Sequence, residues 1–256
     1  MYLHLERREH AAWIVIDRPG ARNALSFEMW DRLGEIAREL SRDSTLRAVI
    51  IAGGPEAFAA GADIAEFTSF AGADDGFAYE ARVESVLRAI EDLQVPTIAA
   101  LAGACTGGGV FLASACDLRI GAANLRVGVP IARTLGNVTT VANVRRLGAI
   151  IGLARVKEWF MTARLLDASR ALAAGFIGEV VPSFDALAPR AEQLASELAG
   201  YAPRTLRATK ELYRRILRDG GEIDDRDILE SCYASADFRE GVAAFFEKRP
   251  AAWRDL

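Results

Sequence analysis

The chain has 256 residues, of which 51% are hydrophobic and 26% are charged, and its formal net charge is −4. This length predicts one full-sized domain with a buried core and argues against two large domains. The small acidic excess also argues against a nucleic-acid-binding protein, because neutralising phosphates requires a concentrated basic surface.

The N-terminal region predicts a β-hairpin followed by a helix. Residues 2–7 alternate apolar and polar side chains, and residues 12–17 are largely apolar, so both segments are typical of strands. Ser26 is then expected to cap a helix in which apolar residues recur at helical spacing as far as Leu40.

The next segment predicts a second passage from strand to helix. Residues 48–52 are entirely apolar, which is typical of a buried strand. A loop with few polar side chains follows, and we expect Asp63 to cap a short helix that begins near Ile64. After a patch of Gly, Ala and Asp at 72–76, which we expect to be flexible, the apolar residues between 79 and 93 predict an amphipathic helix.

The strongest local signal lies between Pro96 and Asp117. A short apolar strand beginning at Thr97 leads to three consecutive glycines, Gly107 to Gly109, and an alanine-rich segment with helical spacing follows. The glycines therefore predict bare backbone N–H groups at the start of a helix. Because a helix N-terminus carries about +0.5 of an elementary charge, this turn suits an anion or an oxygen on which negative charge develops.

The remaining elements complete an α/β pattern. Residues 117–121 and 125–127 predict two further short strands, and the repeated order of strands and helices predicts parallel crossovers. From about residue 138 the pattern is mostly helical, with one strand-like run at 177–181. We expect Asp237 to be the N-cap of the last helix.

Cysteine spacing and the N-terminus predict a cytoplasmic, soluble protein. The cysteines Cys105, Cys116 and Cys232 lack the spacing of a metal site or a disulfide framework, so we expect a reduced environment in which they pack as small hydrophobes. No histidine can be placed beside Cys105 to activate it. The N-terminus has no signal-peptide core, and no run approaches the roughly 20 apolar residues of a membrane span.

Three stretches occur in a distinctive order along the chain. They are Ala-Arg-Asn-Ala-Leu at 21–25, Phe-Ala-Ala-Gly-Ala-Asp-Ile at 58–64, and the glycine-rich segment at 103–117. In this order they resemble the crotonase superfamily, also called the enoyl-CoA hydratase/isomerase family. Each stretch is a weak signal alone, but together with further similar segments they extend the resemblance over almost the whole chain.

The resemblance implies an α/β fold, with a spiral of repeated ββα units in residues 1–195 that holds an acyl-CoA site. It implies a helical C-terminal region in residues 196–256 that serves in trimerisation, and hence a homotrimer or a hexamer of two stacked trimers. The implied ligand is a coenzyme A thioester, with the coenzyme as part of the substrate and no bound cofactor or metal. No nucleic acid or membrane is expected as a partner.

The resemblance also assigns an oxyanion hole. Two backbone N–H groups of the family hold the thioester carbonyl oxygen, and the matching positions here are Ala62 and Gly108. Family reactions pass through an enolate-like oxygen, and losing one such donor costs about 10²–10³ in rate. The coenzyme contacts of the family fall, besides Ala62, on the following positions: Arg22, Ala24, Ala60 and Ile64.

Two residues near the C-terminus match coenzyme contacts that a neighbouring subunit makes in this family. Lys248 is the best match for the cation that meets the coenzyme phosphates, and Phe245 matches an apolar wall. The alternative for Lys248 is a solvated helix end that complements the helix dipole.

The chain departs from the family at both glutamates that hydratases use. One position lies three residues after the central glycine of the triplet and holds Phe111, and the other follows Pro130 and holds Ile131. General acid–base groups contribute roughly 10²–10⁴ each, so ordinary hydratase activity is not expected. The two apolar side chains instead predict a cavity that excludes water and favours an apolar acyl group.

No general acid or base is identified from the sequence. Arg133 could clamp a substrate carboxylate through two hydrogen bonds, and its alternative is a solvated or paired arginine. Glu66 is a candidate base, whereas Asp63 fits a helix cap. Asn137 and Thr139 can form hydrogen bonds, but neither is a base near neutral pH.

These residues leave several functions open. The leading expectation is an enzyme of the lyase or isomerase class that stabilises a thioester enolate, and decarboxylation of a malonyl-type thioester is one reaction that needs little side-chain help. The second is a non-catalytic acyl-CoA-binding or assembly subunit. A nucleotide-phosphate enzyme is disfavoured, because the glycine triplet does not fit G-x-G-x-x-G and no P-loop Lys-Ser or Lys-Thr follows it.

Overall fold

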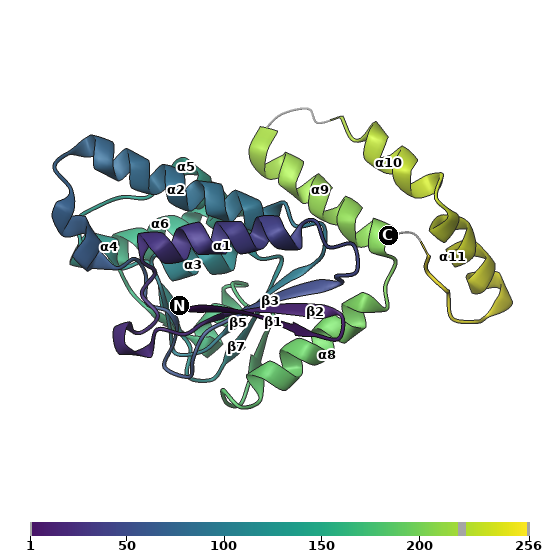
Figure 1. Cartoon of the computed structure of the whole chain (residues 1–256), viewed down its shortest axis with the longest axis horizontal. Coiled ribbons are helices and arrows are strands. Elements are labelled where there is room, and N and C mark those ends of the chain that lie inside the picture. The colour runs from purple at the N-terminus through teal and green to yellow at the C-terminus, as the bar shows by residue number, and fades with distance from the viewer. Residues whose placement is uncertain (1, 220–223, 255–256) are drawn as a thin grey trace.

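Two β-sheets form the centre of the protein, shown in Figure 1 as a computed structural model that describes residues 2–219 and 224–254. In spatial order, the strands of the larger sheet are β1 (Leu3–Arg8), β2 (Ala11–Ile16), β3 (Ala48–Ala52), β5 (Thr97–Leu101), β7 (Leu118–Ala122) and β10 (Glu179–Val181). Those of the smaller sheet are β4 (Ala57–Ala59), β6 (Ala104–Thr106), β8 (Arg126–Gly128) and β9 (Leu166–Asp167).

Helices surround the sheets and make up most of the chain after residue 130. The α-helices are α1 (Phe27–Leu40), α2 (Ala73–Glu91), α3 (Gly108–Ala115), α4 (Ile131–Thr134), α5 (Val141–Ile151), α6 (Leu153–Thr162), α7 (Ala168–Ala173), α8 (Leu187–Ala199), α9 (Pro203–Asp219), α10 (Arg226–Tyr233) and α11 (Ala236–Glu247). Two 3₁₀ helices, η1 (Pro19–Ala21) and η2 (Ile64–Ser69), precede α1 and α2.

After the N-terminal hairpin and α1, the next repeats of the chain each add one strand to each sheet and then a helix. The strands β3 and β4 precede α2, and β5 and β6 precede α3. Within the larger sheet, β2, β3, β5, β7 and β10 pair in parallel, while β1 pairs antiparallel with β2 in the N-terminal hairpin. The predicted spiral of ββα units is therefore confirmed.

Both faces of the larger sheet are buried, as Figure 1 shows from the helices on its two sides. On one face, α1, α2 and α3 pack with strand residues that include Ile14 and Ile51 around one apolar core. On the other face, α8 buries Leu187 and Ala191 against β3, β5 and β7. This double burial explains why the central strands are almost continuously apolar.

Polar side chains set the starts of the first and last helices. The Ser26 hydroxyl caps α1 by accepting a hydrogen bond from the Met29 N–H at 3.3 Å, as predicted. The expectation that Asp237 caps the last helix was wrong. Ser235 caps α11, because its hydroxyl reaches the Phe238 N–H at 3.0 Å, and Asp237 lies in the first turn.

Two other segments differ from their sequence patterns. The helix α2 already begins at Ala73, so most of the 72–76 patch is helical rather than flexible. The Asp75 carboxylate stabilises this start by accepting a hydrogen bond from the Gly72 N–H at 3.1 Å. The strand β4 lies where a loop was expected, since three residues are too few to show an apolar period.

The C-terminal helices continue from the body of the protein. Helix α9 packs on α5, and α10 and α11 extend beyond it, away from the sheets (Figure 1). The division expected after residue 195 falls inside α8, whose residues pack on the larger sheet as far as Leu198. Within the described ranges, no helix is both long and apolar enough to cross a membrane.

Candidate functional site

The glycine triplet lies where β6 ends and α3 begins, as predicted. Gly107 precedes the helix with a φ of 51°, in the left-handed region that favours glycine, and its N–H donates to the Gly128 carbonyl at 3.1 Å. A Cβ on Gly109 would lie 2.3 Å from the Ala59 carbonyl oxygen. The close approach of α3 to β4 therefore requires glycine, and it leaves the Gly108 N–H at the open helix start.

Ala62 is held by the hydrogen bonds of its two neighbours in the chain. The Gly61 carbonyl accepts from the Leu25 N–H at 2.8 Å, and the Asp63 N–H donates to the Leu25 carbonyl at 2.9 Å. In an extended chain the peptide groups of successive residues point in alternate directions. The Ala62 N–H therefore points away from Leu25 and is free to bind another group.

Asn23 and Arg18 anchor the loop that holds Ala62. Asn23 is buried with a φ of 57°, and its amide donates to the carbonyls of Ile16 and Ala57 at 3.0 and 2.8 Å. Arg18 forms an ion pair with Asp63 at 2.7 Å. The Ala-Arg-Asn-Ala-Leu motif thus positions the backbone on one side of the site.

Ala62 and Gly108 line the same cavity, which has a volume of about 220 Å³. A Cβ added to Gly108 would lie 3.6 Å from the Ala62 nitrogen, so the two backbone segments lie in close contact. Neither N–H has a hydrogen-bond acceptor among residues 2–219 and 224–254. Two backbone donors without an internal partner therefore belong to one cavity.

The rest of the cavity wall is mainly apolar. Phe111 is only 8% exposed, and Ile131 packs against the main core. Phe67 and Tyr79 form another part of the wall, with their rings edge to face and the centroids 4.9 Å apart. An apolar wall with a few polar groups is typical of sites that bind small organic ligands.

Two carboxylates expected near the site are engaged in holding the backbone. The Glu66 carboxylate accepts a hydrogen bond from the Phe27 N–H at 2.7 Å, at the start of α1. Asp63 pairs with Arg18 and caps η2 by accepting from the Ala65 N–H at 3.2 Å, so its predicted role as a cap is confirmed. Neither carboxylate is among the residues that line the cavity.

Among the described residues that line the cavity, Glu80 is the one carboxylate. Burial, and then the charge of Glu84, raises the pKa of Glu80 to about 7. Glu84, one turn further along α2, binds the nearby cations Arg146 and Arg88, each at 2.7 Å. The sequence patterns did not indicate Glu80, although its place three residues before Val83 puts it at the edge of the apolar helix face.

The predicted coenzyme contacts divide into two groups. Ala60 and Ile64 line the cavity, and Ile64 is 51% exposed at its rim. Arg22 and Ala24 do not line it, although the Arg22 carbonyl holds the Ala60 N–H at 3.1 Å. Arg133 is exposed on α4 and is likewise absent from the lining.

Phe245 and Lys248 lie on the last helix, apart from this cavity. Phe245 is 79% exposed and lines a separate hollow between α9 and α11. Lys248 is exposed at the C-terminal end of α11, with a φ of 53°. Their contact with a coenzyme bound by a neighbouring subunit stays a prediction.

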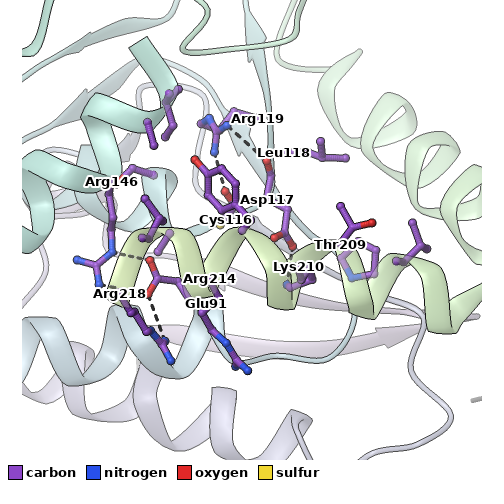
Figure 2. Close-up of a pocket in the computed structure, with 18 of the residues that line it drawn as sticks. Glu91, Cys116, Asp117, Leu118, Arg119, Arg146, Thr209, Lys210, Arg214 and Arg218 are labelled. Atoms are coloured by element: carbon purple, nitrogen blue, oxygen red, sulfur yellow. Dashed lines mark hydrogen bonds and ion pairs between the residues drawn. The ribbon is translucent and has the colours of Figure 1, made fainter. Parts of the chain in front are cut away.

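A larger cavity of about 450 Å³ lies between α9 and the C-terminal end of α3 (Figure 2). Its charged side chains pair with one another: Lys210 lies 2.5 Å from Asp117, and Arg146 lies 2.6 Å from Glu91. Burial raises the pKa of Cys116, which also lines it, to about 12. The Lys210–Asp117 pair holds α9 to the body of the protein, the Arg146–Glu91 pair joins α5 to α2, and we assign the cavity no chemistry.

The predicted packing role of Cys105 is confirmed, because the residue is fully buried and burial raises the pKa of its thiol. No group of three or more histidine, cysteine, aspartate or glutamate side chains within the described ranges could hold a metal ion. The features of this site are therefore the backbone donors of Ala62 and Gly108, an apolar wall and the Glu80 carboxylate.

Comparisons with known proteins agree with this architecture. A sequence profile described as enoyl-CoA hydratase/isomerase matches residues 6–256. A probable enoyl-CoA hydratase of Mycobacterium bovis is 34% identical over 96% of this chain and 95% of its own length. The short-chain-enoyl-CoA hydratase of Clostridium acetobutylicum is 30% identical over 96% of this chain and 94% of its own length. The crystal structure of an enoyl-CoA hydratase/carnithine racemase from Magnetospirillum magneticum matches with a TM-score of 0.90 and 32% identity over 99% and 96% of the two chains.

Proposed function

This chain belongs to the enoyl-CoA hydratase/isomerase family, and from that premise we propose that it binds the carbonyl oxygen of an acyl-CoA thioester between the N–H groups of Ala62 and Gly108. The observation that supports the proposal is that neither N–H group has an acceptor among the described residues and that both belong to residues lining one cavity. Proton removal next to a thioester carbonyl moves charge onto that oxygen, where two fixed donors stabilise it.

The cavity wall supports an apolar acyl group. Both Phe111 and Ile131, which the family resemblance places at the positions of the two hydratase glutamates, belong to the wall. With no carboxylate there to activate water, isomerisation or another enolate reaction fits the site better than ordinary hydration. The coenzyme would extend past Ala60 and Ile64, with Arg22 and Ala24 holding the backbone alongside.

A matched pair of substitutions at Gly108 tests the donor. Proline is tolerated at the first position of a helix but has no N–H, so Gly108→Pro removes the donor, whereas Gly108→Ala keeps it and adds a similar Cβ near Trp30. We expect the proline variant to lose about 10²–10³ in turnover relative to the alanine variant. Equal turnover in two folded variants would reject the role of this N–H.

A panel of CoA thioesters tests which substrate the protein binds and converts. Saturated, 2-enoyl, 3-enoyl and malonyl-type thioesters are offered to the purified protein, with binding measured by calorimetry and products by mass spectrometry. The malonyl-type arm tests decarboxylation, for which Arg133 on α4 is the carboxylate-binding candidate. Absence of binding to every thioester would reject the proposed function.

A non-catalytic acyl-CoA-binding subunit is the second candidate, and the apolar residues Phe111 and Ile131 favour it. Tight binding of thioesters with no conversion of any would support this alternative. For the assembly we propose a homotrimer or a hexamer of two trimers, in which Lys248 and Phe245 reach the coenzyme of a neighbouring subunit. Light scattering tests the assembly, and a monomer would contradict it.

A further inference from the structure

Within the part of the chain that the structure describes, Glu80 differs from the other carboxylates around the cavity in having no partner. Asp63 is paired with Arg18, Glu66 binds the first N–H of α1, and Glu84 takes both nearby arginines. Among residues 2–219 and 224–254, the Glu80 carboxylate has no hydrogen bond or ion pair.

An unpaired carboxylate at this depth is costly for the fold. Burying a charged group without a partner destabilises a protein, and a glutamine or an apolar side chain on α2 would avoid that cost. Burial and the neighbouring Glu84 charge hold its pKa near 7, where a carboxyl group can both take up and release a proton. A half-buried carboxylate of this kind in a ligand cavity is typical of a functional group.

Glu80 lines the same cavity as the two N–H groups but belongs to a different element. Helix α2 forms one side of the cavity with Tyr79, Glu80 and Val83, whereas Ala62 and Gly108 belong to the loop after β4 and to the start of α3. In a cavity of about 220 Å³, a thioester whose oxygen lies at the two N–H groups has its neighbouring carbon within the same small space.

Resting on the proposed function, we infer that Glu80 is the catalytic base that transfers a proton at the carbon next to the thioester carbonyl. The C–H bond at that carbon breaks and its proton goes to a Glu80 oxygen. The electron pair of the broken bond forms the C=C bond of the enolate, and the negative charge moves to the oxygen held by Ala62 and Gly108. Return of the proton to the same carbon restores the substrate. With a 3-enoyl thioester, the double bond shifts and the proton goes instead to the carbon two positions further along the acyl chain. Either step regenerates the Glu80 carboxylate.

Few other charged groups of the cavity's elements can influence this step. Tyr79 and Glu84 lie on α2 beside Glu80, and burial raises the pKa of Tyr79, so that its hydroxyl stays neutral. Asp63 and Glu66 flank the cavity and are engaged as described above. Arg133 on α4 is exposed outside the lining. Glu84 therefore acts on Glu80 through its charge, and Glu80 is the carboxylate that lines the cavity.

Deuterium exchange tests the inference directly. The full-length protein is incubated in deuterium oxide with saturated and 3-enoyl CoA thioesters, and mass spectrometry follows deuterium entering the carbon next to the carbonyl. We expect wild type to exchange and Glu80→Gln to be slower by about 10²–10⁴, with thioester affinity changed less than threefold in calorimetry. Glu80→Asp should retain part of the rate, and Asp74→Asn, an exposed carboxylate on the same helix, should match wild type.

The pH profile provides a second readout that a structural role would not produce. The wild-type exchange rate should rise about tenfold per pH unit below pH 7 and level off above it, because the base must be ionised. In Glu80→Gln, the exchange rate should not show this rise below pH 7.

The outcomes separate the two proposals. Exchange by wild type at a rate that Glu80→Gln preserves would overturn the role of Glu80 and leave the proposed function standing. Thioester binding by wild type without any exchange would also overturn it and would favour the non-catalytic subunit. No binding at all would reject the proposed function and this inference with it.

Discussion

Arg146 on α5 binds Glu84 on α2 through both terminal nitrogens of its guanidinium, at 2.7 and 2.9 Å. The same guanidinium donates through Nε to Glu91 at 2.6 Å, and the Arg146 side chain is only 6% exposed. This contact joins two helices on the site side of the sheet. Glu84 therefore binds Arg146 and Arg88, whereas Glu80, one turn away, forms no ion pair with any cation that the structure describes.

Replacing Arg146 should destabilise the protein strongly. Arg146→Met removes the most buried cation from Glu84 and Glu91, and of the described cations it leaves them only the more exposed Arg88 at 2.7 Å and Arg218 at 3.6 Å. Breaking a buried pair from one side typically costs about 3–5 kcal/mol. Arg88 contacts the same Glu84 but is 57% exposed, so Arg88→Gln should cost less than about 1 kcal/mol. Denaturant unfolding of both variants measures the difference, and similar losses would contradict it.

Gly109 should tolerate no side chain, whereas Gly54 should. A Cβ at Gly109 would meet the Ala59 carbonyl oxygen at 2.3 Å, so Gly109→Ala must displace the start of α3 or β4, at a cost of about 1–3 kcal/mol or more. Nothing lies within 4 Å of a Cβ at Gly54, so Gly54→Ala should change the free energy of unfolding by less than about 0.5 kcal/mol. The displacement should also weaken thioester binding in Gly109→Ala, whereas Gly54→Ala should bind thioesters like wild type. Calorimetry measures both affinities.

Restoring two glutamates should create hydration. Wild type should hydrate crotonyl-CoA poorly, and Phe111→Glu combined with Ile131→Glu should raise the rate by at least tenfold, because each acid–base group contributes roughly 10²–10⁴ when well placed. Burial will raise the pKa of a carboxyl group at position 111, so the assay is run up to pH 9. The matched Phe111→Gln, Ile131→Gln variant should gain nothing. A gain in that variant would show that carboxylates are not the cause.

Glu80 should make stability depend on pH. Burial, and then the Glu84 charge, raises its pKa from 4.5 to about 7 in the folded protein, so the folded state keeps this proton where the unfolded chain has released it. The stability that Glu80 contributes is complete below about pH 4.5 and is lost as the pH rises through 7. The loss in free energy of unfolding between pH 5 and pH 8 should therefore be smaller in Glu80→Gln. An equal loss would place the Glu80 pKa near its ordinary value.

Helices and strands whose pattern depends only on neighbouring residues in the chain could be predicted from the sequence. The strand at 48–52 is apolar throughout because both faces are buried, and Ser26 caps α1 through its own hydroxyl. The start of α3 after Gly107 follows from the glycine triplet and the alanine-rich segment after it. The family resemblance then supplied Ala62 and Gly108, which lie on one cavity.

Elements and side-chain roles that depend on contacts with distant parts of the chain could not be predicted from the sequence. The strand β4 has three residues and exists because it pairs with β6. Glu66 was a candidate base in the sequence analysis. In the structure its carboxylate accepts a hydrogen bond from the Phe27 N–H, which lies far away in the sequence. No sequence pattern singled out Glu80, because its place in the cavity wall arises only when α2 and α3 pack together.

The way Ala62 is held bears on protein engineering. Gly61 and Asp63 are clamped to Leu25, and the Ala62 methyl group takes no part in those bonds. Libraries that vary the side chain at position 62 can therefore reshape the ligand space and retune acyl selectivity while the backbone around it keeps its geometry.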